Sequence, residues 1–163
     1  MSDTVHVITV SDRVSSGARE DVSGDAAVEL LQAEGHTVTT SLVPDGADAV
    51  EAALRAALAD GARLVVTTGG TGLSPRDRTP EGTAPVLDRE VPGLAELLRA
   101  EGARQTPFAA ISRGLVGIVD ASDECPGALV VNLPGSTKGV TQGLQVLLPL
   151  VGHVLDQISG GDH

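Results

Sequence analysis

A cluster of glycines at residues 69–72 is the first feature of this sequence that could bind a ligand. Gly69, Gly70 and Gly72 are interrupted only by Thr71, and they follow an apolar run. Glycine lets backbone N–H groups turn toward one point, and such a concavity suits phosphate or carboxylate oxygens. A plain glycine turn explains the same cluster equally well, because glycine also serves ordinary chain geometry.

Two aspartates could add metal chemistry to this loop. Asp77 lies in the same loop, between Arg76 and Arg78, and Asp45 follows a neighbouring strand pattern. Mg2+ is usually held by one or two carboxylates together with substrate phosphates, so both aspartates are candidate Mg2+ ligands. The alternatives are a solvated ion pair for Asp77, worth under about 1 kcal/mol, and a turn or helix-capping role for Asp45.

The one lysine of the chain, Lys138, lies at the predicted start of the last helix, close to Ser136. A cation is unfavourable at the amino end of a helix, so a nearby anion would explain it, although a plain surface lysine is the more ordinary explanation. The Ser136 hydroxyl could help to hold a phosphate, or it could simply cap the helix.

Several other kinds of site are disfavoured by missing motifs. The segment 70–75 lacks the third glycine of GxGxxG, and no GxxxxGK[ST] occurs, which argues against dinucleotide and P-loop sites. No HExxH, GxSxG or paired-His spacing supports a zinc or serine-hydrolase site. Cys125 is the one cysteine and has acidic neighbours, so we interpret it as an incidental thiol.

The composition indicates a small acidic protein with an aliphatic core. The 163 residues include 11 basic and 22 acidic side chains, a formal net charge of -11, with one Phe and no Trp or Tyr. We expect no nucleic-acid partner, because a basic field and stacking aromatics are both missing. A flat ligand would have to lie against glycine backbone and aliphatic side chains. The first ten residues lack a signal-peptide pattern and no stretch reaches the ~20 apolar residues of a membrane span, which favours a soluble, cytoplasmic protein without a membrane partner.

The first 70 residues alternate between strand and helix patterns. Ser23 is a candidate N-cap for the first helix, and Asp48 with Glu51 resembles a capping box for the second. The third strand is a near-continuous apolar run, which is typical of a strand covered on both faces in a parallel sheet. This alternation predicts βαβ units, with strands at 5–10, 37–43 and 64–68 and a polar loop from 11 to about 22.

The second half of the chain continues the pattern with one change of direction. Thr79 is a candidate N-cap with Pro80 at the first helical position, and Leu94, Leu97 and Leu98 mark the next helix. Strands at 116–119 and 128–133 are joined by the acidic loop Asp120–Gly127, whose Pro-Gly pair favours a hairpin turn. Residues 137–158 are helical in pattern, and we expect Pro149 to kink or divide that helix.

Together these elements predict an α/β fold, a three-layer αβα sandwich with a mostly parallel sheet and one antiparallel hairpin, in one domain over residues 1–163. Ligands of such sheets gather beyond the carboxyl ends of the strands. The candidate glycine loop and both aspartates follow predicted strands, so we expect the site at this edge.

Two longer motifs carry a resemblance to a known family. The segment 67–81 reads TTGGTGLSPRDRTPE and the segment 132–136 reads NLPGS. Both resemble the MogA/MoaB family of molybdenum-cofactor biosynthesis, and the likeness covers nearly the whole chain. The resemblance implies a molybdenum-cofactor-binding-domain-like fold and a molybdopterin adenylyltransferase, which transfers AMP from Mg-ATP to molybdopterin and releases pyrophosphate.

The resemblance also implies site residues and partners. It assigns catalysis and Mg2+ to Asp45 and Asp77. The partners it implies are molybdopterin and ATP, a homotrimer or a hexamer, and a molybdenum-insertion protein of the MoeA type. Contacts with molybdopterin or AMP are assigned to Ser11, Asp12, Gly69, Gly70, Thr71, Gly72, Ser112, Asn132, Pro134, Gly135, Ser136 and Lys138.

Two observations leave alternatives open. The loop 120–127 is longer and more acidic than the turn usual in the family, so we expect that edge to differ in assembly or ligand access. The family also includes MoaB-like proteins that bind molybdopterin without catalysis, and such a binding or scaffold role is the alternative; the presence of Asp45 and Asp77 favours the active type. A hydrolase of the CinA group is a further alternative, which the Gly-Thr-Gly and Thr-Pro-Glu elements fit poorly.

Overall fold

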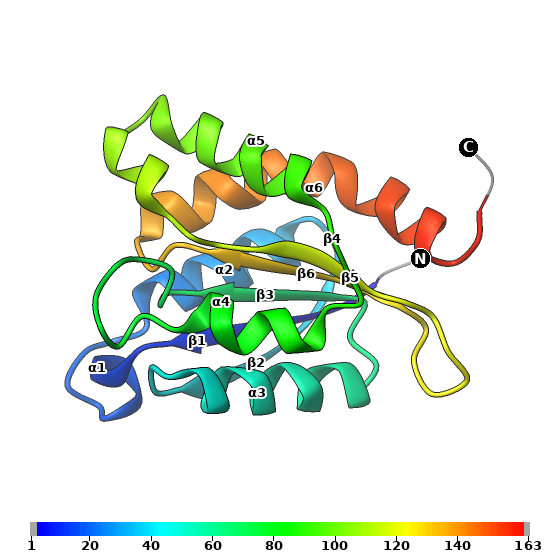
Figure 1. Ribbon diagram of the computed structural model, residues 1–163, viewed down its shortest axis with the longest axis horizontal. Coiled ribbons are helices and arrows are strands. Elements are labelled where there is room, and N and C mark those ends of the chain that lie inside the picture. Colours follow the sequence, from blue (N-terminus) through cyan, green and yellow to red (C-terminus); the bar gives the residue numbers. More distant parts are fainter. Residues whose placement is uncertain (1–2, 162–163) are drawn as a thin grey trace.

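The computed structural model describes residues 3–161 and contains a six-stranded sheet covered by helices on both faces (Figure 1). The first and last two residues of the predicted 1–163 domain lie outside this range. The strand order is β2-β1-β3-β6-β5-β4. The strands are β1 (Thr4–Val10), β2 (Thr37–Val43), β3 (Leu64–Thr68), β4 (Arg89–Glu90), β5 (Val116–Val119) and β6 (Ala128–Leu133).

The parallel half of the sheet follows the predicted βαβ pattern. β1 pairs in parallel with β2 and β3, and β3 pairs in parallel with β6. Every residue of β3 and of β6 is buried, as expected for strands covered on both faces. The predicted mostly parallel α/β sheet is therefore confirmed.

The antiparallel half begins at the predicted hairpin. β5 pairs with β6 in antiparallel register, Val119 opposite Ala128, and the two-residue strand β4, which the sequence did not indicate, extends the sheet beyond β5. The acidic loop 120–127 lies at the end of the sheet opposite the glycine loop (Figure 1). Within one chain the loop is therefore remote from a site at the glycine loop, and its expected effect on assembly or ligand access stays a prediction.

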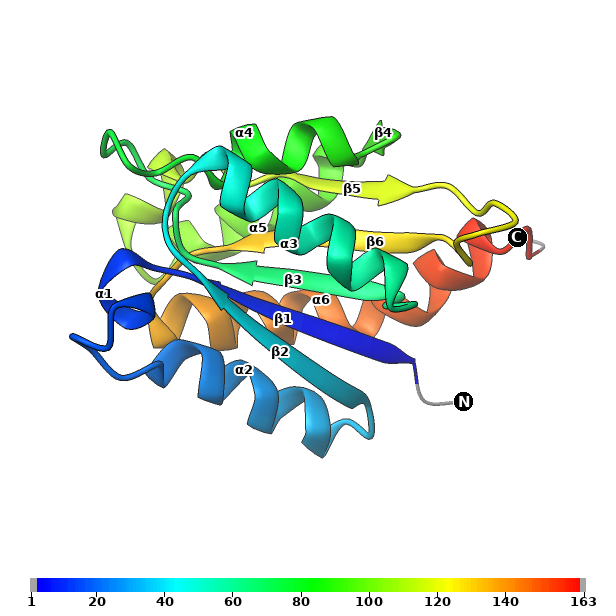
Figure 2. The same cartoon turned by 90° about the horizontal axis from the view of Figure 1, so that it is seen from below.

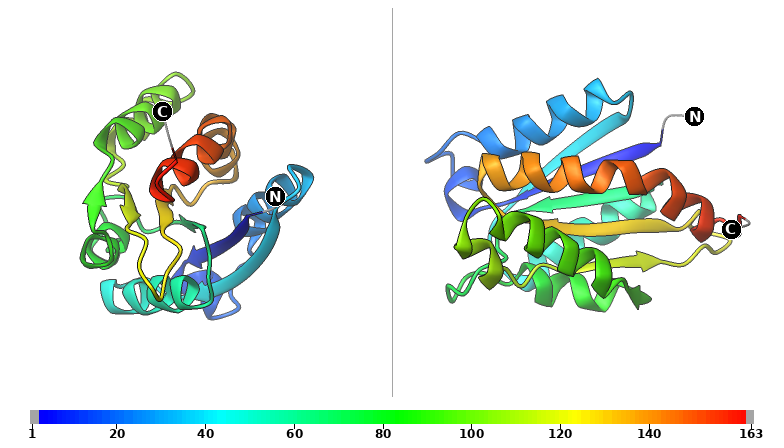
Figure 3. Two further views of the ribbon diagram at one scale, coloured as in Figure 1. Left: turned by 90° about the vertical axis from the view of Figure 1, so that its right-hand side faces the viewer. Right: turned by 90° about the horizontal axis from the view of Figure 1, so that it is seen from above.

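Helices form the outer two layers. On one face lie α2 (Val22–Ala33), α5 (Pro92–Ala103) and α6 (Thr137–Ile158), which Figure 3 shows from above. On the other face lie α3 (Ala47–Ala59) and the short α4 (Thr79–Thr83), which lie in front in Figure 2. Two aliphatic clusters fill the interfaces, one on each side of the sheet. No helix within residues 3–161 is long and apolar enough to cross a membrane.

The predicted caps of α2, α3 and α4 are wrong in detail, because tertiary partners decide them. Asp21, not Ser23, caps α2: one carboxylate oxygen accepts from the Gly24 N–H at 3.0 Å and the other accepts from the Thr9 hydroxyl at 2.7 Å. α3 begins after Gly46, which has φ 127° and makes no side-chain cap, so the proposed capping box at Asp48 does not form. Thr79 is already helical, and its hydroxyl donates to the Gly69 carbonyl at 2.9 Å instead.

Short helical segments occupy regions that the sequence left without structure. α1 (Asp12–Ser15) lies in the predicted polar loop, and two 3₁₀ turns, η1 (Ala84–Val86) and η2 (Pro107–Ile111), connect longer elements. α6 is not divided at Pro149. Proline removes one hydrogen bond of a helix, and the buried side chains of α6 on both sides of Pro149, including Leu147 and Val151, hold its two halves against the sheet.

Candidate active site

The loops that follow β1, β2, β3 and β6 lie together at one edge of the sheet, at the left of Figure 1. Gly69 is the first residue after β3 and is buried, with φ 97° and its N–H donating to the Leu133 carbonyl at 3.0 Å. A Cβ at this position would lie 2.4 Å from the Val10 carbonyl oxygen. Only glycine therefore lets the ends of β1, β3 and β6 approach this closely.

The rest of the glycine loop presents unused backbone donors. Gly70 has φ 68° and its carbonyl accepts from the Thr79 N–H at 3.0 Å. Within residues 3–161, the N–H groups of Gly70, Thr71 and Gly72 have no hydrogen-bond acceptor. Consecutive free N–H groups around positive-φ glycines are the arrangement that binds anions.

Asp45 and Asp12 lie side by side after β2 and β1. The Asp12 N–H donates to Asp45 Oδ2 at 3.0 Å, and the Asp45 N–H donates to Asp12 Oδ1 at 3.1 Å. Arg76 reaches both from the glycine-loop side, with two bonds to the Asp12 carboxylate and one to the Asp45 carbonyl. The hydrogen bond from Arg76 is the main cause that holds the pKa of Asp12 below its ordinary value, against partial desolvation.

Asp77 also lies against the glycine loop, next to Gly72. Its Oδ2 accepts from the Ser74 N–H at 3.1 Å and lies 2.8 Å from the position that a Cβ of Gly72 would take. Asp45 Oδ1 lies 3.3 Å from the corresponding position at Gly70. Both predicted carboxylates therefore lie against the loop, at glycines two residues apart. Each keeps one oxygen, Oδ1, without a hydrogen-bond partner among the described residues.

A cavity of about 770 Å3 opens on the opposite side of the glycine loop, between β5, β6, α5, η2 and the start of α6. Thr71 and Gly72 form the wall that separates it from Asp45 and Asp77, which do not line it. Its charged lining residues are Arg99 and Lys138, and no carboxylate of residues 3–161 lines it. The lining also includes the predicted residues Ser112, Asn132, Pro134 and Ser136.

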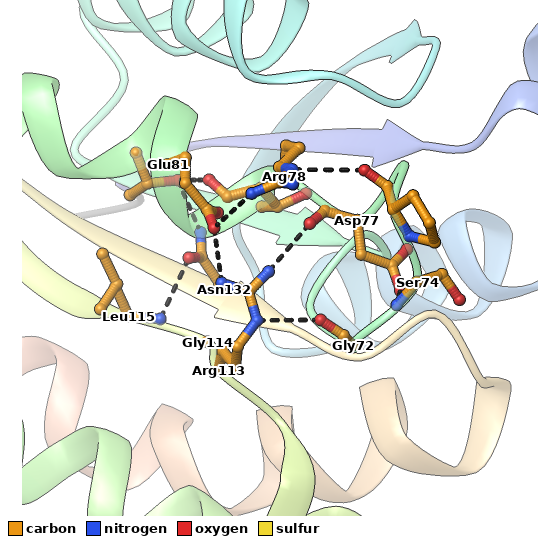
Figure 4. Close-up of polar contacts among 12 residues, drawn as sticks. Gly72, Ser74, Asp77, Arg78, Glu81, Arg113, Gly114, Leu115 and Asn132 are labelled. Carbon is orange, nitrogen blue, oxygen red and sulfur yellow. Dashed lines mark hydrogen bonds and ion pairs between the residues drawn. The ribbon is translucent and has the colours of Figure 1, made fainter.

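The Asn132 side chain is used by the protein itself. Its Nδ2 donates to the hydroxyls of Thr67 and Thr83, each at 3.0 Å. Its Oδ1 accepts from the Leu115 N–H at 3.0 Å, which Figure 4 shows. Both amide N–H donors are therefore engaged. A contact between Asn132 and substrate stays a prediction, and Oδ1 is the atom with capacity left for it.

The other predicted residues also have structural partners. Ser11 caps α1 by accepting from the Val14 N–H at 3.2 Å, and Ser136 caps α6 by accepting from the Gly139 N–H at 3.1 Å. A Cβ at Gly135 would lie 3.3 Å from the Gly69 Cα, so Gly135 brings the loop after β6 onto the glycine loop. Capping uses the serine hydroxyls as acceptors and leaves their O–H donors available.

Three residues of this region were missed by the sequence analysis. Phe108, the one Phe, Tyr or Trp of the sequence, lines the cavity with 76% of its surface exposed, so a ring is available there. The expectation that a flat ligand lies against glycine backbone and aliphatic side chains stays a prediction. Arg99 lines the cavity and donates to the carbonyls of Ser112 and Gly114. Arg113 donates to two carbonyls of the glycine loop, to Gly72 from its side chain and to Thr71 from its backbone N–H. The rarity of aromatic residues was a signal for Phe108. The pair Ser112-Arg113 resembles the family but gave Arg113 no role, and nothing in the sequence around Arg99 indicated one.

Comparison with protein families gives one match that covers most of the chain. Residues 6–153 match the family model described as "Probable molybdopterin binding domain". This range includes the glycine loop, both aspartates and the lining of the cavity.

Individual relatives agree with this match. A "Molybdenum cofactor biosynthesis bifunctional protein" of Synechococcus elongatus is 41% identical over 96% of the chain, which spans 48% of that protein. A "Molybdopterin adenylyltransferase" of Pyrococcus furiosus is 39% identical, with 91% of this chain and 87% of that protein covered. Among solved structures, the molybdopterin biosynthesis enzyme MoaB of Thermus thermophilus superimposes with a TM-score of 0.86, at 44% identity and 97% coverage of both chains.

Proposed function

Because the chain belongs to the family of probable molybdopterin binding domains, we propose that it is a molybdopterin adenylyltransferase, which joins the AMP of ATP to molybdopterin and releases pyrophosphate. The observation that carries the proposal is the pair Asp45 and Asp77, which lie against one glycine loop with one free carboxylate oxygen each. A protein that only binds a pterin has no need of such a pair. The bifunctional relative is about twice as long as this chain, so the proposal does not extend to the whole activity of that protein.

The volume of the cavity, its charged lining residues and the ring of Phe108 suit molybdopterin. Molybdopterin carries a flat ring system and a phosphate, and a cavity of about 770 Å3 lies within the range of small-molecule sites. Lys138 and the free N–H groups at the start of α6 would meet the phosphate, since the amino end of a helix favours anions. Phe108 at the mouth offers a ring face for the flat part of the ligand.

The glycine loop suits the triphosphate of ATP. Its unused N–H groups at Gly70, Thr71 and Gly72 are fixed donors for phosphate oxygens. Adenylyl transfer gathers negative charge on those oxygens in the transition state, so donors already in place lower the barrier without a covalent intermediate. Because Thr71 and Gly72 also line the cavity, the loop brings the nucleotide phosphates next to the bound pterin.

The donor set fits Mg2+ as the accompanying ion. Among the described residues, no three or more His, Cys, Asp or Glu side chains are grouped to hold a metal by themselves. Mg2+ takes one or two protein carboxylates and completes its coordination with phosphates and water, and the free Oδ1 atoms of Asp45 and Asp77 are carboxylate oxygens of this kind. Asp45 and Asp77 would hold it, and the ion would supply charge neutralisation at the phosphates.

The test is release of pyrophosphate from Mg-ATP in the presence of molybdopterin. We expect Asp77→Asn to lose most turnover while its Kd for molybdopterin, measured by pterin fluorescence, stays within about threefold of wild type. Asp123→Asn, in the acidic loop at the far end of the sheet, is the matched control and should keep both. A wild-type protein that binds molybdopterin and releases no pyrophosphate refutes the enzyme and supports the non-catalytic alternative.

We further propose that the protein acts in the cytoplasm as a homotrimer and delivers its product to a molybdenum-insertion protein of the MoeA type. Exposed apolar side chains, among them Leu73 and Ile111, are available for contacts between subunits or with that partner. Light scattering after gel filtration distinguishes a trimer from a hexamer or a monomer.

A further inference from the structure

We propose that Arg113 positions Asp77 relative to the cavity, an inference that rests on the proposed function. The Arg113 side chain donates to three groups on two segments: the Gly72 carbonyl at 2.9 Å, the Asp77 carbonyl at 2.8 Å and Glu81 Oε1 at 2.6 Å. Its backbone N–H donates to the Thr71 carbonyl at 2.9 Å. Figure 4 shows the guanidinium between Gly72, Asp77 and Glu81.

Among the described residues, Arg113 makes the one hydrogen bond that ties Asp77 to another part of the fold. The remaining bonds of Asp77 are local: its N–H donates to the Ser74 carbonyl at 3.0 Å and its Oδ2 accepts from the Ser74 N–H. These local contacts hold the turn 74–77 together, and Arg76 ties the same turn to the loops after β1 and β2. The Arg113 guanidinium fixes the backbone carbonyl of Asp77 itself and so limits where the Asp77 carboxylate can stand.

The backbone on both sides of Arg113 forms part of the cavity wall. Its neighbours Ser112 and Gly114 line the cavity, and Arg99 of α5 donates to their carbonyls at 3.3 and 2.9 Å. The backbone of residue 113 is thus fixed to α5, while its side chain holds the opposite side of the glycine loop. One residue links the cavity, where the pterin would bind, to the carboxylate beyond the loop.

Glu81 completes the link and explains why an arginine is needed. Burial alone would raise the pKa of Glu81, but the hydrogen bond and charge of Arg113, with help from Arg78, hold it below its ordinary value, so the carboxylate stays charged opposite the guanidinium. The planar fork of arginine reaches three acceptors in fixed directions, whereas the single ammonium of lysine is a flexible point charge. Lysine at position 113 cannot keep all three bonds.

The experiment compares Arg113→Met and Arg113→Lys with wild type by three measurements. We expect kcat for adenylyl transfer to fall at least tenfold in both, because small displacements of a reacting group have large effects on rate. The Kd for molybdopterin should stay within about threefold. Amide hydrogen exchange in residues 72–79 should become about tenfold faster, with no change in the strands.

Arg104→Met is the matched control, because Arg104 lies on the surface and its one ion pair among the described residues is with Glu101 at 3.5 Å. It should leave all three measurements unchanged. Methylguanidinium at millimolar concentration should restore part of the turnover of Arg113→Met and none of that of Asp77→Asn. The lysine variant keeps a positive charge, and the same measurements on it test the proposal if the methionine variant does not fold.

The outcomes separate this inference from the proposed function. If wild type transfers no adenylyl group, the proposed function fails, and the exchange measurement still tests whether Arg113 holds the segment 72–79. Unchanged exchange in that segment overturns the positioning role. Equal losses of kcat and of pterin affinity also overturn it, because they would show a general structural effect.

Discussion

Replacement of Gly69 by alanine is the sharpest available test of how the fold builds the site. The new Cβ would stand 2.4 Å from the Val10 carbonyl oxygen and 3.9 Å from the Gly135 Cα. These atoms are backbone, and Val10 is buried at the end of β1. No side chain can turn away, so the strand ends themselves must separate.

The expected cost has two parts. A non-glycine residue at positive φ, here 97°, costs about 1–2 kcal/mol. Forcing a methyl group into a packed site costs about 1–3 kcal/mol more. We therefore expect Gly69→Ala to lower the free energy of unfolding by about 2–5 kcal/mol, from the sum of these ranges.

Gly61→Ala separates the two parts. Gly61 has φ 86°, and nothing lies within 4 Å of the position of its Cβ. This control carries the backbone strain without the overlap, so it should lose only about 1–2 kcal/mol. Urea unfolding of both variants at 25 °C measures the difference. Gly69→Ala should in addition lose about 100-fold in kcat/KM, since it moves the loop by a fraction of an ångström or more, and Gly61→Ala should lose none.

Equal losses of stability in the two variants would refute the reasoning. They would mean that the ends of β1 and β3 can separate at no cost, and that the close approach at Gly69 does not set the site. Unchanged activity in Gly69→Ala together with the larger loss of stability would refute only the step from packing to catalysis.

Two other substitutions test the polar contacts around the loop. Asn132→Ala removes two buried hydrogen bonds and one part-buried bond, and it leaves the Leu115 N–H unpaired, so we expect a loss of about 3 kcal/mol in urea unfolding; a loss below about 1 kcal/mol would show that water replaces the amide. Glu81 has a folded pKa below its ordinary value, so its contribution to stability is complete above the unfolded pKa of about 4.3 and disappears as pH falls through the lower, folded pKa. The stability difference between wild type and Glu81→Gln should therefore be constant from pH 7 to about pH 5 and shrink below about pH 4; parallel curves down to about pH 3 would contradict the pairing with Arg113.

The long elements could be predicted because each carries its own pattern. The strands at 37–43, 64–68, 116–119 and 128–133 have the predicted bounds, since continuous β-branched and aliphatic runs need no distant information. The two-residue strand β4 has too few residues for any pattern. The caps at Asp21 and Gly46 depend on Thr9 and on the turn after β2, which a local signal does not contain.

The candidate site divides in the same way. The glycines and Asp77 lie in one continuous segment, so their chemistry is readable from spacing, and Asp45 was found as a residue that follows a strand. Arg113 was not readable, because its partners Gly72 and Glu81 lie 41 and 32 residues away in the sequence. Only the fold shows that its side chain donates to the carbonyls of Gly72 and Asp77.

Net charge gave the weakest guide to the ligand, and the fold explains why. A net charge of -11 would repel an anionic substrate if all the charges of the protein acted on it without screening. At physiological salt, however, exposed charges more than about 8 Å away are largely screened. What a ligand meets at short range is the cavity, whose charged lining residues are Arg99 and Lys138. The Arg99 guanidinium donates to neutral carbonyls, so its charge is not cancelled by those contacts. An acidic protein can therefore offer a locally cationic cavity, because no carboxylate of residues 3–161 lines it and Asp45 and Asp77 lie outside it, against the glycine loop.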